Sequence, residues 1–538
     1  MKRHVRSLAV VLALVSFAAC GAQDPATPEA RADEQTLVRG DNAFALDLYG
    51  KLREQEGNLF FSPYSISTAL GMTYAGARGN TEAQMAKVLH FDLPQEKLHP
   101  AFKSLLEGLG ARRKEGGYEL SVANALWGQK GYPWLKEFLD VTRGNYGAGL
   151  REVDFAGDTE GARKTINDWV EKQTREKIKE LLLKGDVGRE TALVLTNAIY
   201  FKGDWASQFK KDRTRPGPFS LSDGTKVEVP MMRQTEEFGY METEDLQALE
   251  LPYVKGHLAM IVLLPRKVDG LPALEGSLTV EKLEGWLGLL HKEEEVSVIL
   301  PKFKMTSRFE LNEVLKALGM TDAFDGADFS GMDGVRDLFI SKVIHKAFVD
   351  VNEEGTEAAA ATAVAVDRAV ARMAEFHADH PFLFLIRDNA SGSILFMGRV
   401  ADPTGAADST VPVAGTKPEE GPLPQDKEGN FVLWVGNRSQ GTSPVDIKVQ
   451  IDGKEAVRAD FDTSEVLGYA PPYKSYRFRL APGKHELTVT WEKGGQKVER
   501  EFEVKDRHWA LIAYYYDPAS DQEPRLSLGV QDEPIPIR

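Results

Sequence analysis

Few residues of this chain have the types and spacing that hydrolytic or metal-assisted chemistry requires. The serines of Ser391-Gly392-Ser393 do not belong to a Gly-x-Ser-x-Gly elbow, the turn that presents a nucleophilic serine to its base. His377 and His380 precede Pro381 and lack the His-Glu-x-x-His pattern of a helical zinc site. We therefore expect no catalytic activity, no cofactor and no bound metal.

Cys20 is the only cysteine, which excludes an internal disulfide framework and a cysteine-based metal site. It follows a basic start and an apolar run over residues 8–18, which is too short to span a bilayer. The sequence Phe17-Ala18-Ala19-Cys20 resembles the lipobox of bacterial lipoproteins, in which the cysteine is lipidated, although phenylalanine replaces the usual leucine. The alternative is an ordinary secretory signal with a chance cysteine. Both interpretations predict export, to the envelope or cell surface if Cys20 is lipidated, and only the lipid would contact a membrane.

The stretch from Val349 to Val370, VDVNEEGTEAAAATAVAVDRAV, has the pattern of a segment with two conformations. Alanine favours helix over strand, yet the residues sort with the period of two that is typical of a strand. No proline interrupts residues 356–370. One face is small and uncharged, and it comprises Thr356, Ala358, Ala360, Thr362, Val364 and Val366.

The composition is that of a soluble globular protein, with 42% hydrophobic and 27% charged residues. A net charge of −15 argues against a nucleic-acid partner, because phosphate binding needs a concentrated basic surface. A length of 538 residues exceeds one hydrophobic core, so at least two domains are expected. We expect a monomer.

Residues 39–402 mix helix and strand patterns without a repeated βαβ period, which predicts an α+β fold. Ser62-Pro63 opens a predicted helix, and Asp158 can cap another whose apolar positions run to Leu181. Residues 191–205 are nearly all apolar, as in a strand buried on both faces. Further strands are predicted over residues 246–252, 258–265, 296–301 and 338–350.

The regions on either side of this body differ in composition. Residues 1–20 form the predicted signal peptide and 21–38 a polar tether. Residues 403–428 lack aromatic residues and are rich in Pro, Gly and acidic residues, which predicts a linker. Residues 429–538 alternate at period two over six runs, which predicts a small all-β, sandwich-like domain of unknown role.

Five segments, in order and spread over residues 39–402, resemble the serpin family. They are NLFFSPYSISTAL with GARGNT, TNAIYFKGDW, LPKFKMTSRFELNEVLKALGMTDAF, HKAFVDVNEEGTEAAAAT and FHADHPFLFLIRDNASGSILFMGRV. The resemblance implies the serpin fold, with three β-sheets, about nine helices and an exposed reactive loop. It also implies a suicide-substrate inhibitor of serine proteases, with cysteine proteases as a further class of target. The protease cleaves the loop, which then inserts into the central sheet and traps the acyl-enzyme.

The same resemblance assigns roles to residues by motif. It implies a polar shutter beneath the central strands at Ser62, Ser65, Asn197 and His345, and a breach residue, Trp205, where the loop enters. His345 shares its strand face with apolar residues, which is also typical of a hydrogen-bonded core histidine. The implied hinge comprises Glu354, Gly355, Thr356, Glu357, Ala358, Ala359 and Ala360.

The position of the cleaved bond depends on a register that the sequence leaves open between two adjacent bonds, with Arg372 as a third candidate for the residue before the bond. Counting seventeen residues from Glu353, as in many inhibitory family members, places the bond at Ala369-Val370 and predicts an elastase-like or subtilisin-like target. A shift by one places it at Arg368-Ala369 and predicts a trypsin-like target with an acidic pocket.

A second hypothesis is a non-inhibitory serpin-fold protein of the cell surface that binds partners through its C-terminal β domain. Trp434, Trp491, Trp509 and the tyrosines at 514–516 could form a ligand platform there. Aromatic residues at alternating spacing are also typical of a β-sandwich core.

Overall fold

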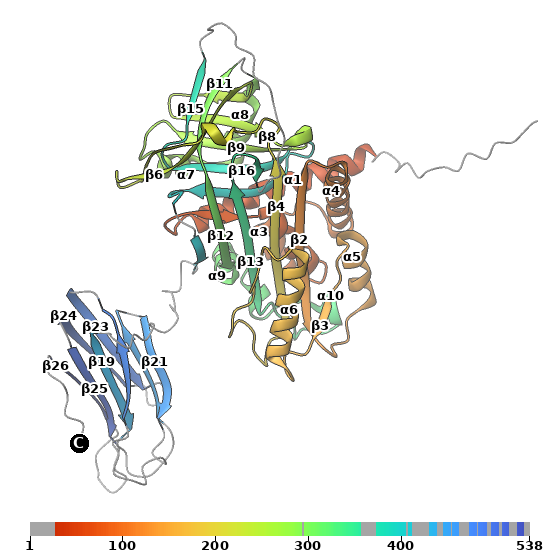
Figure 1. Ribbon diagram of the computed structural model, residues 1–538. Coiled ribbons are helices and arrows are strands. Elements are labelled where there is room, and N and C mark those ends of the chain that lie inside the picture. Colours follow the sequence, from red (N-terminus) through yellow and green to blue (C-terminus); the bar gives the residue numbers. More distant parts are fainter. Residues whose placement is uncertain are drawn as a thin grey trace, which may run out of the picture. The chain divides into compact units, whose positions relative to one another are not determined.

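The computed structural model describes residues 27–292, 295–356, 373–404, 407–411, 430–437, 445–452, 454–461, 473–480, 483–491, 496–504, 508–515 and 525–531. The chain divides after Ala414 into two units, drawn in Figure 1. The predicted signal peptide with Cys20 and the residues from Glu357 to Arg372 lie outside the described part of the chain. None of the described helices is both long and apolar enough to cross a membrane.

Two helices of the first unit begin where the sequence provides capping residues. The Ser62 hydroxyl accepts the backbone N–H of Ser65 at 3.1 Å, and the Asp158 carboxylate accepts that of Gly161 at 2.9 Å. The described α-helices are α1 (Pro28–Leu52), α2 (Pro63–Tyr74), α3 (Gly79–Leu89), α4 (Gln95–Glu115), α5 (Lys136–Tyr146), α6 (Thr159–Gln173), α7 (Leu271–Ser277), α8 (Val280–Leu289), α9 (Asn312–Leu318) and α10 (Ser330–Asp333).

The central sheet has the order β18-β12-β13-β14-β4-β2-β3. Its strands are β18 (Ala407–Val411), β12 (Phe303–Glu310), β13 (Lys342–Val351), β14 (Gly355–Thr356), β4 (Leu193–Asp204), β2 (Tyr118–Gln129) and β3 (Arg151–Val153). Figure 1 shows α6 against one face of this sheet, and an apolar cluster fills the space between them. The main apolar core includes residues of α2 and lies on the other face. This explains why β4 is apolar on both faces, as the sequence predicts.

Two further sheets complete the first unit. One has the order β1-β17-β16-β9-β8-β7-β10 and the other β15-β11-β6-β5. Their strands are β1 (Leu59–Phe61), β17 (Ile394–Val400), β16 (Phe382–Asp388), β9 (Leu258–Pro265), β8 (Leu246–Pro252), β7 (Gly239–Glu242), β10 (His291–Lys292), β15 (Ala374–His377), β11 (Val296–Pro301), β6 (Lys226–Glu236) and β5 (Arg215–Ser220). The expected α+β fold with three sheets is confirmed.

The second unit is a sandwich of two four-stranded sheets, ordered β22-β19-β25-β26 and β21-β20-β23-β24. Its core is apolar and includes Phe431, Leu433, Val449 and Leu487. The strands are β19 (Phe431–Asn437), β20 (Val445–Ile451), β21 (Lys454–Phe461), β22 (Tyr473–Phe478), β23 (Gly483–Trp491), β24 (Gln496–Val504), β25 (His508–Tyr515) and β26 (Arg525–Gln531). Six match the predicted runs, whereas β21 and β26 were not predicted.

Three boundaries differ from the sequence-based expectation. Helix α1 already begins at Pro28 within the predicted tether, because the Thr27 hydroxyl accepts the N–H of Ala30 and Pro28 suits a first helical turn. Helix α6 ends at Gln173, so Leu181 is buried in the segment that follows and not in the helix. Five residues of the predicted linker form β18.

Candidate functional site

The hinge lies at one end of a seam between two central strands. Strands β13 and β4 pair directly and in parallel from Lys342 opposite Val194 to Phe348 opposite Tyr200. Beyond that point β14 lies between them, with Thr356 opposite both Val351 and Gly203. A strand that continued from Thr356 along the sheet would therefore have to separate β13 from β4.

Thr356 is already part of the core at this point, with 0% of its surface exposed. Its hydroxyl lies 3.0 Å from the Tyr253 hydroxyl, and the Tyr253 ring stacks on Trp205 with centroids 4.7 Å apart. The Trp205 indole N–H donates to the carbonyl of Asn352 at 3.0 Å. A side chain on Gly355 would collide with the carbonyl of Gly203, so only glycine allows this close approach of the two backbones.

Two glutamates, Glu353 just before the hinge and Glu354 at its start, hold the chain in place. Glu353 is 5% exposed, and its carboxylate accepts from Lys302 Nζ at 2.8 Å and from the Thr214 hydroxyl at 2.9 Å. Burial alone would raise the pKa of Glu353, but the hydrogen bonds from Lys302, from the backbone and from Thr214, together with the charge of Lys302, outweigh it and hold the pKa below its ordinary value. Glu354 forms an ion pair with Lys211. The start of the hinge is therefore held by two ion pairs, from Lys302 to Glu353 and from Lys211 to Glu354.

The four predicted shutter residues meet in one hydrogen-bonded cluster. The backbone N–H of Ser62 donates to His345 Nε2 at 3.1 Å, so Nδ1 carries the hydrogen that His345 donates to Asn197 Oδ1. Asn197 Nδ2 donates to Ser65 Oγ at 2.7 Å. Burial lowers the pKa of His345 to about 3, which keeps the ring neutral. The bond from His345 to Asn197 joins β13 to β4 and so crosses the seam.

Sequence reasoning missed a fifth member of this cluster. Asn124 of β2 accepts from Asn197 Nδ2 at 2.6 Å and from the Ser65 hydroxyl at 2.9 Å, and it donates to the carbonyl of Ser65 at 3.0 Å. Strand pairing places Asn124 directly opposite Asn197. A lone asparagine in a strand pattern gives no sign of this role, because the contacts of Asn124 depend on how β2 pairs with β4.

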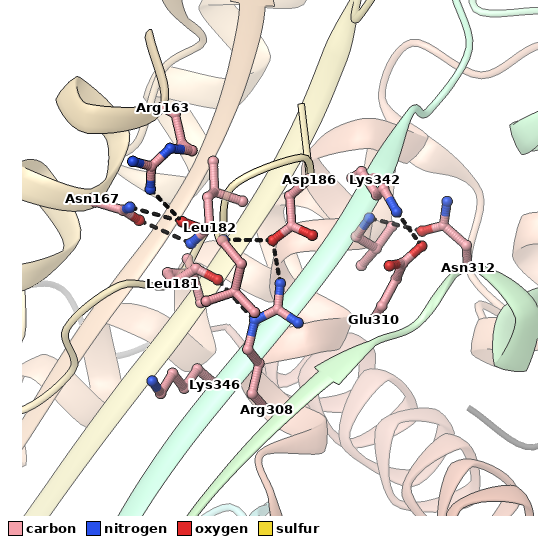
Figure 2. A network of polar contacts seen from close by, with 12 residues as sticks. Arg163, Asn167, Leu181, Leu182, Asp186, Arg308, Glu310, Asn312, Lys342 and Lys346 are labelled. Atoms are coloured by element: carbon pink, nitrogen blue, oxygen red, sulfur yellow. Dashed lines mark hydrogen bonds and ion pairs between the residues drawn. The ribbon is translucent and has the colours of Figure 1, made fainter. Parts of the chain in front are cut away.

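A polar network covers the seam on the face that carries α6 (Figure 2). Arg308 of β12 donates from Nε to the carbonyl of Leu181 at 2.9 Å and forms an ion pair with Asp186. Asn167 of α6 donates to the carbonyl of Leu182 at 2.9 Å and accepts its N–H at 2.8 Å.

Beneath these polar contacts, the segment after α6 packs on both strands of the seam. Ile178, Leu181 and Leu182 belong to one apolar cluster with Tyr200 of β4 and Phe348 of β13. A strand inserted between β13 and β4 would have to displace this segment from the sheet.

Several predicted site residues lie outside the described residues: Cys20, Glu357 with Ala358, Ala359 and Ala360 of the hinge, and Arg368, Ala369 and Val370 of the predicted bonds. The described hinge residues Glu354, Gly355 and Thr356 lie together with Trp205, as described above. His377 lies in β15 and pairs with Ile299 of β11, and His380 Nε2 lies 2.7 Å from the carbonyl of Pro265. Among the described residues, no group of three or more His, Cys, Asp or Glu side chains could hold a metal ion.

Comparison with known proteins links this arrangement to one family. Residues 39–403 match the family model described as "Serpin (serine protease inhibitor)". Human "Leukocyte elastase inhibitor" is 48% identical over 381 residues, which cover 69% of this chain and 100% of the relative. Human "Serpin B3" is 45% identical over 390 residues, covering 68% of this chain and 100% of the relative.

Solved structures give the same result. Uncleaved ovalbumin superposes with a TM-score of 0.63 at 33% identity, covering 68% of this chain and 100% of the ovalbumin chain. Serpin48 of the insect Tenebrio molitor gives a TM-score of 0.62 at 36% identity, covering 68% of this chain and 98% of its own.

Proposed function

The chain belongs to the serpin family, and we propose that it inhibits serine proteases as a suicide substrate by inserting its cleaved loop between β13 and β4. The observation that carries the proposal is β14, where Thr356 is buried between the two strands and pairs with both. The hinge thus already occupies the first positions of an added strand.

The length of the loop supports insertion along the whole seam. Continuing the antiparallel register from Thr356 opposite Gly203 brings Val366 opposite Leu193, the first residue of β4. Thr356 to Val366 is also the stretch whose alternate residues are small and uncharged. The inserted strand would thus fill the sheet without burying a charge. About ten new ladder hydrogen bonds, at about 1 kcal/mol each, would make insertion favourable, so the uncleaved form would be held by a kinetic barrier.

The chemical step belongs to the protease. Its serine oxygen attacks the carbonyl carbon of the residue before the cleaved bond and forms an ester, and the amine of the following residue leaves with a proton from the protease's histidine. Insertion must then occur before water hydrolyses the ester. A bond at Ala369-Val370 fits an elastase-like target, and the similarity to a relative named "Leukocyte elastase inhibitor" supports it. A bond at Arg368-Ala369 and a trypsin-like target form the second register.

The test is incubation of the purified chain with pancreatic elastase, subtilisin and trypsin, followed by denaturing electrophoresis. The expected result is an SDS-resistant adduct with at least one of them, and mass spectrometry of the fragments then identifies the bond. Cleavage of the loop by all three proteases without any adduct would contradict inhibition. A cut in the adduct outside residues 366–373 would exclude both registers.

We also propose export and attachment to the membrane through lipid on Cys20, because the only cysteine follows a signal-like apolar run. Metabolic labelling with radioactive palmitate tests this. The wild-type chain should be labelled and Cys20→Ser should not, whereas equal labelling of both would contradict the proposal.

A further inference from the structure

Strand β18 adds an edge to the central sheet from outside the family-matched residues. It pairs in parallel with β12, from Ala407 opposite Met305 to Val411 opposite Phe309. The match to the family model ends at residue 403, so this strand comes from the segment that follows it. Without β18, the eight residues of β12 would be an open edge.

Polar contacts guide the chain from β17 toward this position. The Asn58 side chain accepts the N–H groups of Ala401 and Asp402 at 2.7 and 2.9 Å and donates to the carbonyl of Asp402 at 2.7 Å. The Asp402 carboxylate then accepts the N–H of Thr404 at 2.8 Å. These contacts turn the chain three residues before β18 begins.

The residue types of the added strand fit the register. Opposite the buried Met305, Ser307 and Phe309 stand Ala407, Ser409 and Val411, which are small or apolar. The two remaining positions, opposite Thr306 and Arg308, are Asp408 and Thr410, which are both polar. By residue type alone, the segment alternates between small or apolar and polar positions, which is the pattern expected of an edge strand.

The two edges of the sheet are protected in different ways. At the far edge, β3 is a strand of only three residues that begins with Arg151 and Glu152, and short, charged edge strands resist pairing with another chain. Strand β12 is longer and mostly buried along its length, so it would offer a better template if it were open.

The sequence of β12 is also complementary to a second, antiparallel copy of itself. In an antiparallel pair of two β12 strands centred on Ser307, Lys304 of one copy lies opposite Glu310 of the other, and Met305 lies opposite Phe309. Within one chain, Lys304 lies 3.7 Å from Asp350 and Glu310 pairs with Lys342, so the contact between copies would add to these ion pairs. Opposite charges at facing positions stabilise a strand pair. A two-fold axis through Ser307 makes each contact twice.

We propose that residues 407–411 close the edge of β12 against β12 of a second copy of this chain. The variant Ser409→Pro with Thr410→Pro disrupts β18. In a parallel ladder alternate residues donate their backbone N–H to the neighbouring strand, so one of the two prolines removes a hydrogen bond to β12. The matched control places two prolines just beyond the strand, at Ala414 and Gly415.

Two measurements on the full chain test the proposal without any protease. In hydrogen exchange, residues 407–411 should be protected in the wild type and in the control. In the Ser409→Pro/Thr410→Pro variant, about half of the amides of β12 should exchange at least tenfold faster at protein concentrations where the chain is monomeric. Unprotected residues 407–411 in the wild type would overturn the proposal.

The second measurement is the oligomeric state by light scattering as the concentration rises. The proline variant should dimerise, whereas the wild type and the control stay monomeric. Adding Lys304→Glu should abolish dimerisation, because two glutamates then face each other, and adding Glu310→Lys as well should restore it. A proline variant that stays monomeric, or one whose dimer ignores the charge at position 304, would overturn the proposal.

Discussion

Acid should weaken the native state through one buried histidine of the shutter. His345 is 0% exposed and accepts the N–H of Ser62 while donating to Asn197. Protonation would turn Nε2 into a donor facing another donor, in a site without solvent. The closed seam therefore stabilises the neutral ring of His345, and protonation of the ring destabilises the closed seam.

The expected loss follows from two pKa values. The ordinary histidine pKa of 6.5 applies to the unfolded chain, and burial lowers the folded value to about 3. A folded pKa below the unfolded one means that the stability is present above pH 6.5 and is lost as the pH falls toward 3. Each pKa unit corresponds to about 1.4 kcal/mol, so by pH 5 the loss from His345 is about 2 kcal/mol.

The assay compares urea unfolding midpoints between pH 8 and pH 5 for the wild type and His345→Gln. Glutamine can accept from Ser62 and donate to Asn197 but does not titrate, so the variant should lack about 2 kcal/mol of the acid-induced loss. His99→Gln is the matched control, because burial also lowers the pKa of His99, to about 4, at a site outside the shutter.

Hydrogen exchange separates the two histidines. At pH 5 the amides along β13 and β4 should exchange faster, after correction for intrinsic rates, in the wild type and in His99→Gln, but not in His345→Gln. If His345→Gln keeps the full pH dependence of the wild type, the neutral-histidine argument is wrong.

Three other perturbations have expected outcomes. Thr356→Arg would bury an unpaired charge at the start of the inserted strand at a cost of several kcal/mol, so the protease should cleave the loop and dissociate. Thr356→Ser should still form the SDS-resistant adduct, and denaturing electrophoresis distinguishes the two outcomes. Arg308→Ala removes the ion pair with Asp186 and the hydrogen bond to the carbonyl of Leu181. It should lower the thermal unfolding midpoint and speed hydrogen exchange of the amides along the seam. An unchanged exchange rate would show that these contacts do not hold the segment after α6 over the seam. Burial raises the pKa of Asp41 to about 7, so the wild type loses stability as the pH rises from 4 to above 7. In urea unfolding, Asp41→Asn should lose that pH dependence. An unchanged pH profile would show that Asp41 is not the cause.

The sequence predicts most of the first unit because its signals are local. The cap at Ser62, the apolar run of β4 and the period-two sorting around Thr356 all depend on neighbouring residues. The contacts that hold the seam closed are not local: Arg308 meets Asp186 and Asn197 meets Asn124 only after the sheet has formed. Strand β18 was missed for another reason, because its residues lie in a segment whose composition is that of a linker.

The register at the hinge connects the shutter to the loop through one residue. Extending the pairing of Thr356 along either β13 or β4 brings Thr362 into the row of His345 and Asn197. The proposed insertion would break the bond between those two side chains, and each would be left buried without its partner. Thr362 shares the inward face with Thr356 and carries the only hydroxyl on that face after it, so it can donate and accept in their place.

Thr362→Val keeps the shape of the side chain but lacks the hydroxyl, and leaving buried polar groups unpaired costs about 1–3 kcal/mol. Insertion should then be slower and less complete. More molecules of Thr362→Val than of wild type should be consumed per protease inhibited, whereas Thr362→Ser should match the wild type. If Thr362→Val inhibits with the wild-type stoichiometry, either the inserted register differs from that of β14 or the shutter finds another partner, and the continuity of hinge and inserted strand argued here fails.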